Sequence, residues 1–181
     1  MRGNQYVITG YEPVVDQNTD HCMIASTIED AEDCFVDAKE RLLDINNWNK
    51  YSPIPGVTFR LTDGHGRPVN RKAHKGDHVK IELASGSGAH CCGVVESIEY
   101  DDYPDLCMEA FTLRLRPCVH GQETSDEHDE IIEGAMVIER RYKHIYTSFH
   151  ARNVLDHANT SESLCGLTPA QWNSLAKKFV S

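Results

Sequence analysis

Apolar residues recur at intervals of three and four along the segment that begins near residue 27. Thr27 can serve as an N-cap, and acidic residues follow it where the helix dipole favours negative charge, at Glu29, Asp30, Glu32 and Asp33. The apolar stripe consists of Ala31, Phe35, Ala38, Leu42 and Ile45. This spacing predicts an amphipathic helix that ends near Asn46-Asn47, before Pro53.

A second helical pattern lies at the C-terminal end of the sequence. Thr168 and Pro169 supply an N-cap and a proline at the first helical position, and Gln171 can complete a capping box. Apolar residues then follow at helical spacing, at Trp172, Leu175, Ala176, Phe179 and Val180. So short a helix is marginal by itself in water, so we expect it to dock on the rest of the protein.

Between these helices the apolar period changes to two, which is typical of strands. The alternating segments are 57–62, 79–83, 94–100, 108–116, 135–140 and 144–152. Only two convincing helices accompany them, so the pattern predicts an α+β fold. We expect a curved antiparallel β-sheet of about six to seven strands with an N-terminal helix and a short C-terminal helix. The alternative is a small SH3-like β-barrel with flanking helices, which the hairpin at 75–79 would also suit.

The sequence contains no internal repeat and predicts one α+β domain over residues 1–181. Residues 1–20 are a candidate N-terminal arm. Two segments of low hydrophobicity, Thr62–Asp77 and His120–Glu133, are interpreted as loops between strands rather than as domain linkers. A chain of 181 residues is long enough to bury one substantial core.

Composition narrows the range of partners and locations. The formal net charge of −10 argues against nucleic acid or an anionic membrane as a partner, and no apolar stretch approaches the length of a membrane span. The first fifteen residues lack the apolar core of a signal peptide, so we expect a cytoplasmic location. Seven cysteines, an odd number, then favour free thiols over a disulfide framework.

His90-Cys91-Cys92 raises the question of a metal site. Structural zinc sites usually use Cys-x2–4-Cys pairs, and no such pair occurs among the cysteines at 22, 34, 91, 92, 107, 118 and 165. In a strand, Cys91 and Cys92 would point to opposite faces, while His90 and Cys92 would share one. We interpret the segment as the start of a strand. A four-ligand site would require His21-Cys22 to lie alongside it, so no metal and no cofactor is predicted.

A second cluster of polar residues occupies 144–153. Strand alternation places His144, Tyr146, Ser148 and His150 on one face. A serine two residues from a histidine invites a nucleophile hypothesis. However, no Gly-x-Ser-x-Gly elbow surrounds Ser148, and the sequence places no acid to orient the imidazole. We favour a solvent-facing polar strand face over a pocket-lining one, and no catalytic residue is predicted.

The segment 24–35 (IASTIEDAEDCF), followed by 47–53 (NWNKYSP), resembles the opening of the START-like (Bet v 1-like) superfamily. In that superfamily an edge strand leads into helices, and a tryptophan-proline turn returns the chain to a long curved antiparallel sheet. The resemblance implies a helix-grip fold whose cavity, between the sheet and the C-terminal helix, often holds a hydrophobic small molecule. The C-terminal helix of that superfamily is usually long. In this sequence Gly166 and Pro169 leave room for only a short one.

Three further segments, Gly76-Asp77, His150–Asn153 and Gln171-Trp172, look like those of an uncharacterised family of small bacterial proteins. That similarity implies no function. The superfamily resemblance leads us to expect a non-catalytic domain that binds a small hydrophobic ligand in a sheet-helix cavity. Its candidate lining residues are Phe59, Phe111, Tyr146, His150, Arg152, Trp172 and Phe179.

Two alternatives remain open at the level of sequence. The chain could be a structural subunit of a homo-oligomer or larger protein assembly, in which Tyr6-Val7-Ile8 of the arm adds to a neighbour's sheet. It could also be a metal- or His-dependent enzyme, which would require His150 or His90 in a cleft beside a partnered nucleophile.

Overall fold

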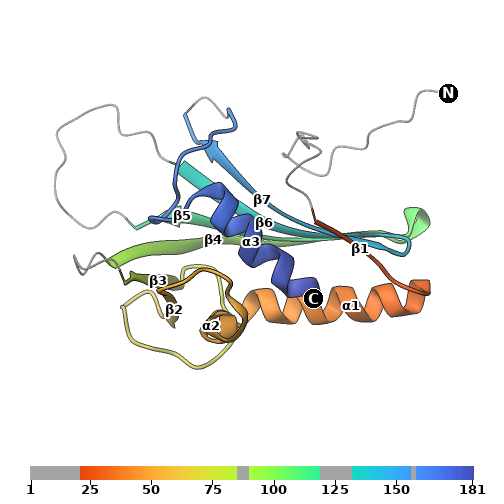
Figure 1. Ribbon diagram of the computed structural model, residues 1–181, viewed down its shortest axis with the longest axis horizontal. Helices are drawn as coiled ribbons and strands as arrows, with labels where there is room; N and C mark the ends of the chain where they lie inside the picture. Colours follow the sequence, from red (N-terminus) through yellow and green to blue (C-terminus); the bar gives the residue numbers. More distant parts are fainter. Residues whose placement is uncertain (1–20, 85–89, 119–131, 156–157) are drawn as a thin grey trace.

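The computed structural model describes residues 21–84, 90–118, 132–155 and 158–181. Its strands form one antiparallel sheet in the order β1-β7-β6-β5-β4-β3-β2 (Figure 1). The strands are β1 His21–Ile24, β2 Val57–Thr62, β3 His78–Leu83, β4 His90–Tyr103, β5 Met108–Pro117, β6 Ile132–Arg141 and β7 His144–Asn153. The α+β prediction is confirmed. Because β1 and β2 form the two edges of an open sheet, the SH3-like barrel alternative is wrong.

The helices are α1 Ile28–Leu43, α2 Trp48–Tyr51 and α3 Pro169–Ala176. Short 3-10 turns occur at Ile45–Asn47, Pro104–Leu106 and Lys177–Val180. Figure 1 shows α1 and α3 lying along the same side of the sheet. We call this side the helix face and the opposite side the open face. Within the described residues, none of the helices is both long and apolar enough to cross a membrane. The predicted arm at 1–20, and most of the loop predicted at 120–133, lie outside the described residues.

Helix α1 begins and packs as its sequence predicts. The Thr27 hydroxyl accepts a hydrogen bond from the Asp30 amide at 3.0 Å, and the Asp30 carboxylate accepts one from the Thr27 amide at 3.2 Å. The whole predicted apolar stripe is fully buried: Ala31, Phe35, Ala38, Leu42 and Ile45. The helix ends at Leu43, slightly earlier than predicted, because the chain tightens there into the 3-10 turn.

An aromatic cluster joins α2, β2, β7 and α3 on the helix face. The Trp48 ring lies 5.3 Å from the Phe59 ring, centroid to centroid, and Trp172 stacks on Phe149 at 5.4 Å. Trp48 also contacts Trp172 at 6.5 Å and Phe179 at 5.8 Å. All five side chains are at least 96% buried. This cluster gives the short C-terminal helix the docking surface that it needs.

The outer edge of β7 is covered in three ways. Strand β1 pairs only with its first half, from His144 to Thr147. Beyond that, the Asn173 side chain of α3 accepts a hydrogen bond from the Phe149 amide at 2.8 Å and donates one to the Phe149 carbonyl at 3.4 Å. Residues 158–160 then pair with 151–153 through backbone hydrogen bonds. The Asn173 side chain and residues 158–160 thus form hydrogen bonds with backbone groups of β7 that an exposed strand edge would present to other chains.

The segment between β2 and β3, predicted as a loop, is held by one buried carboxylate. Asp77 is 4% exposed, and its two oxygens accept hydrogen bonds from the Arg71 guanidinium at 2.5 and 2.9 Å. The His74 amide donates to the same carboxylate at 2.8 Å. Burial alone would raise the pKa of Asp77, but these hydrogen bonds from Arg71 and His74 outweigh it, so the pKa lies below its ordinary value.

Replacing Gly134 by alanine is expected to destabilise the fold. Gly134 lies on the helix face of β6, where an added Cβ would sit 2.6 Å from the Phe149 ring and would collide with Leu164. Both neighbours are buried, so they cannot move aside freely. We expect Gly134→Ala to lower the free energy of unfolding by about 1–3 kcal/mol in urea titrations. Gly64→Ala is the control, because the nearest atom to its Cβ is 3.4 Å away, and equal losses in the two variants would contradict the packing argument.

The Asp77 carboxylate should make stability depend on pH. A carboxyl whose pKa is lower in the folded than in the unfolded state contributes stability above the unfolded pKa, near about 3.9, and loses it as the pH falls through the folded pKa. We expect Asp77→Asn to cost about 2 kcal/mol at pH 7. The difference between wild type and variant should shrink as the pH falls below about 4. A difference that stayed constant from pH 7 to pH 2 in denaturant titrations would contradict the ion pair.

Candidate functional site

Polar side chains gather on the open face, where the four strands β4 to β7 cross its middle. Arg114 of β5 pairs with Ser97 on one side and with Ala135 on the other, and Ala135 pairs with His150 of β7. Residues directly opposite each other in an antiparallel sheet share a face, so these side chains form one row across it. Glu133 pairs with Arg152 in the adjacent position.

The row borders a depression of about 520 Å³. We call it the charged depression, and its lining residues are Lys75, Glu96, Ser97, Glu99, Arg114, Glu133 and Arg152. The register of β4 shifts between Val95 and Ser97, which is a β-bulge at Glu96. A bulge re-aims side chains, and here two consecutive residues, Glu96 and Ser97, both line the same site.

A network of ion pairs forms the floor of the charged depression. The Glu133 carboxylate lies between two guanidinium groups, 3.7 Å from Arg114 and 2.9 Å from Arg152. Arg114 also donates to both carboxylate oxygens of Glu99, at 3.1 and 3.3 Å. Arg114 and Glu133 are each 8% exposed. Because buried charges are stable only when paired, the network fixes these side chains before any ligand arrives.

The charge state of Glu99 follows from its partners. Burial acts to raise the pKa of this carboxyl, but the hydrogen bonds from Arg114 and Ser97 act in the opposite direction and outweigh it. The pKa of Glu99 therefore lies below its ordinary value, and the group stays ionised at neutral pH. The depression accordingly presents fixed charges of both signs.

Ser148 and His150 meet beside the charged depression. The Ser148 hydroxyl lies 2.8 Å from the His150 Nε2, which is within hydrogen-bonding distance. The predicted alternation is confirmed, because Ile145, Thr147 and Phe149 are buried on the helix face. Ser148 is only 7% exposed, so this part of the strand is less solvent-facing than predicted.

The seven residues predicted to line a ligand cavity separate into two groups. Four belong to the buried core on the helix face: Phe59, Phe111, Trp172 and Phe179. The other three are half-buried on the open face: Tyr146, His150 and Arg152. Since the two groups lie on opposite sides of the sheet, a single small ligand cannot contact both. Of the seven, only Arg152 lines the charged depression.

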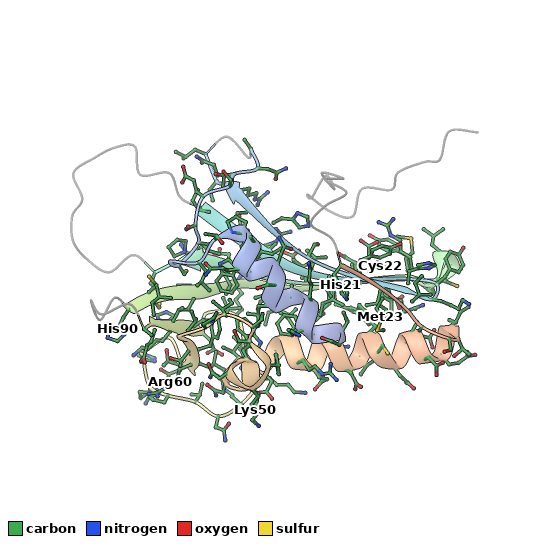
Figure 2. All side chains as sticks on the ribbon, viewed as in Figure 1. His21, Cys22, Met23, Lys50, Arg60 and His90 are labelled. Atoms are coloured by element: carbon green, nitrogen blue, oxygen red, sulfur yellow. A yellow bond between two sulfur atoms is a disulfide. The ribbon has the colours of Figure 1, made fainter. Side chains whose placement is uncertain are left out.

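The four-ligand metal set considered from sequence does not assemble. His21 and Cys22 lie on edge strand β1, whereas β4, which carries His90 and Cys92, lies four positions away in the sheet. Figure 2 shows His90 far from His21 and Cys22.

The expectation of free thiols is wrong for two of the seven cysteines, Cys92 and Cys118. These two form a disulfide, with their Cα atoms 5.2 Å apart. The pairing arises because Cys118, just after β5, lies opposite Cys92, and its amide donates to the Cys92 carbonyl at 2.8 Å. The remaining cysteines are free: Cys22, Cys34, Cys91, Cys107 and Cys165.

Sequence reasoning missed most of the charged depression. Arg114 stands between Leu113 and Leu115 in an alternating segment, so its position on the face opposite the core could have been inferred. Glu133 was assigned to a loop, and no spacing rule connects it to Glu99 or Arg114. Comparisons with protein-family models, with curated proteins and with solved structures found no match for this chain.

Removing the charge of Glu133 should destabilise the fold, because Arg114 and Arg152 both pair with this carboxylate. We expect Glu133→Gln to lower the free energy of unfolding by about 2 kcal/mol, because Arg152 loses the charge of its hydrogen-bonded partner and the buried Arg114 keeps Glu99 but loses one of its two carboxylates. Glu96→Gln is the matched control, since Glu96 forms an exposed ion pair with Arg116 and should cost less than about 1 kcal/mol. Urea titration measures both, and equal small losses would show that the network does not contribute to stability.

Proposed function

We propose that the protein is a non-catalytic ligand-binding domain and that its ligand occupies the charged depression. The observation that carries this proposal is the Glu99–Arg114–Glu133–Arg152 network, with Arg114 and Glu133 buried at its centre, beneath a depression of about 520 Å³. Binding sites for small molecules combine a concave surface with a few polar groups held in fixed positions. The network supplies such groups.

The charges of the lining residues select the ligand class. Lys75, Arg114 and Arg152 are cationic, and Glu96, Glu99 and Glu133 are anionic, so the site carries three charges of each sign. A small molecule with both an anionic and a cationic group can pair with both signs. We therefore propose a small zwitterionic ligand.

We also propose that the domain is related to the START-like superfamily. The order of its elements supports this, because an edge strand, β1, leads into α1, and the Trp48–Pro53 turn returns the chain to the sheet. The superfamily resemblance implies a hydrophobic ligand between the sheet and the C-terminal helix. Such a ligand would have to displace Trp172, whose ring contacts those of Trp48, Phe59 and Phe149. This packing is why we place the ligand on the open face.

A thermal-shift screen tests the proposal. The purified protein is heated with amino acids and betaines in one set and with fatty acids and planar aromatic compounds in another. At a hundred times its dissociation constant, a ligand stabilises the native state by about 2.7 kcal/mol, which is a shift of several degrees. We expect shifts only in the zwitterion set. Stabilisation by apolar compounds alone would contradict binding in the charged depression and would favour a ligand site between the sheet and α3.

Calorimetric titration of a zwitterion found in the screen then locates the site. Lys75→Gln should weaken binding about tenfold, the effect of losing one charge-assisted hydrogen bond. Lys80→Gln is the matched control, because Lys80 is an exposed lysine of β3 that does not line the depression. Equal weakening by both substitutions would indicate a nonspecific charge effect and would count against the site.

A further inference from the structure

Three potential metal ligands meet on the open face, near the start of β4. They are His78 of β3, Cys92 of β4 and Cys118, which follows β5. The nitrogen and the two sulfur atoms all lie within 4.8 Å of one another. All three residues are half-buried, so the site is reachable from solvent.

Backbone pairing on neighbouring strands fixes this arrangement. His78 pairs with Val94 and Lys80 pairs with Cys92, so His78 lies diagonally across from Cys92 on the same face. The Cys118 amide donates to the Cys92 carbonyl at 2.8 Å, which holds the second sulfur beside the first. The backbone hydrogen bonds of the ladder hold these positions in addition to the disulfide, so we expect the arrangement to persist when the sulfurs are reduced.

The combination of groups matches the preferences of zinc. Two thiolates and one imidazole form a Cys2His set, with Zn–S near about 2.3 Å and Zn–N near about 2.0 Å. In a tetrahedral site these bond lengths put the ligand atoms roughly 3.5–3.8 Å apart. The imidazole nitrogen lies within 4.8 Å of both sulfurs, and the two sulfurs, which are joined in the disulfide, would move apart by side-chain rotation once it is reduced. His78 adds a third potential ligand to the two sulfurs, which a disulfide alone does not provide.

We propose that His78, Cys92 and Cys118 bind one zinc ion when the Cys92–Cys118 disulfide is reduced. Two thiolates neutralise the ion's charge, and water or an external ligand takes the fourth position, as in zinc sites with three protein ligands. The disulfide and the zinc complex are alternative states of the same pair of sulfur atoms.

Conversion of the disulfide into the zinc complex requires a reductant, for which a dithiol suffices. The dithiol transfers two electrons and two protons to the disulfide, which becomes two cysteine thiols, while the dithiol becomes its own cyclic disulfide. Zn²⁺ then displaces the two thiol protons into solvent as the two Zn–S bonds form. In the reverse direction, the cyclic disulfide takes two electrons from the two zinc-bound thiolates and two protons from solvent and becomes the dithiol again, while Cys92 and Cys118 re-form their disulfide and the zinc ion is released.

Two other thiols, those of Cys91 and Cys165, lie near Cys92 but on the helix face of the sheet. The Cys165 thiol donates to the Cys92 carbonyl at 3.5 Å, and Cys91 points to the same face as Cys165. Burial and the nearby Cys91 raise the pKa of Cys165 to about 12. Both thiols lie on the helix face, so the sheet separates them from His78 and they cannot join the three-ligand set.

Cobalt titration of the full chain tests the proposal. Reduced protein is titrated anaerobically with Co²⁺, and zinc is then added in competition. We expect one metal ion per chain, a thiolate-to-cobalt charge-transfer band and d–d bands of tetrahedral intensity, all removed by zinc. The oxidised protein should show none of these signals. Failure of the reduced wild type to bind one equivalent would overturn the proposal.

Variants assign the ligands. His78→Gln should weaken zinc binding at least about tenfold and leave the Cys92–Cys118 disulfide able to form, as read by thiol alkylation and mass spectrometry. Cys118→Ser should remove the charge-transfer band, whereas Cys22→Ser, which changes an exposed free thiol, should not. Thermal unfolding of each variant verifies that it is folded. Unchanged metal affinity in a folded His78→Gln protein would overturn the three-ligand site.

Discussion

The packing of Trp172 against Trp48, Phe59 and Phe149 is the contact on which the rest of the structure depends. Helix α3 has only eight residues, too few to be stable alone, and Trp172 anchors it at the end of its first turn. The indole N–H donates to the Leu164 carbonyl at 3.1 Å, so the loop before the helix is fixed by the same side chain. Gly134 leaves the space that Phe149 and Leu164 fill.

This packing decides where a ligand or ion can bind. Successive residues of a strand point to opposite faces, so strands β4 to β7 supply apolar side chains to the core on the helix face and polar ones to the open face. The helix face is occupied by the protein's own rings. The open face carries the buried ion pairs around Arg114 and, near the start of β4, the group formed by His78, Cys92 and Cys118. Both proposed sites thus follow from the same alternation.

Local patterns predicted the elements but not their partners. Helices α1 and α3 were predicted because caps and a period near 3.6 lie within short stretches, and the alternation on β7 was equally local. Strand β4 runs from His90 to Tyr103, beyond both predicted ends, because pairing with β3 extends its beginning and pairing with β5 extends its end. The Cys92–Cys118 contact spans 26 residues and depends on strand register, which no spacing rule supplies.

The charged depression could not be predicted from the sequence for a related reason. Glu133, Arg114 and Glu99 belong to three different strands and become neighbours only through the register of β4, β5 and β6. In sequence, Glu133 stands at the end of an acidic segment that resembles any solvated loop. Its burial at 8% exposure is a property of the sheet and not of the segment.

Side chains occupy the space between α3 and the sheet, and for this reason we place the proposed ligand on the open face. The chain contains two tryptophans, both fully buried within the aromatic cluster, so their emission reports on this interior alone. The most direct measurement is tryptophan emission of the native protein during titration with an environment-sensitive apolar dye such as anilinonaphthalene sulfonate. The account predicts unchanged tryptophan emission and no dye fluorescence until the protein unfolds. Saturable binding of one dye per chain to the native protein, together with a shift in the wavelength of tryptophan emission, would contradict it.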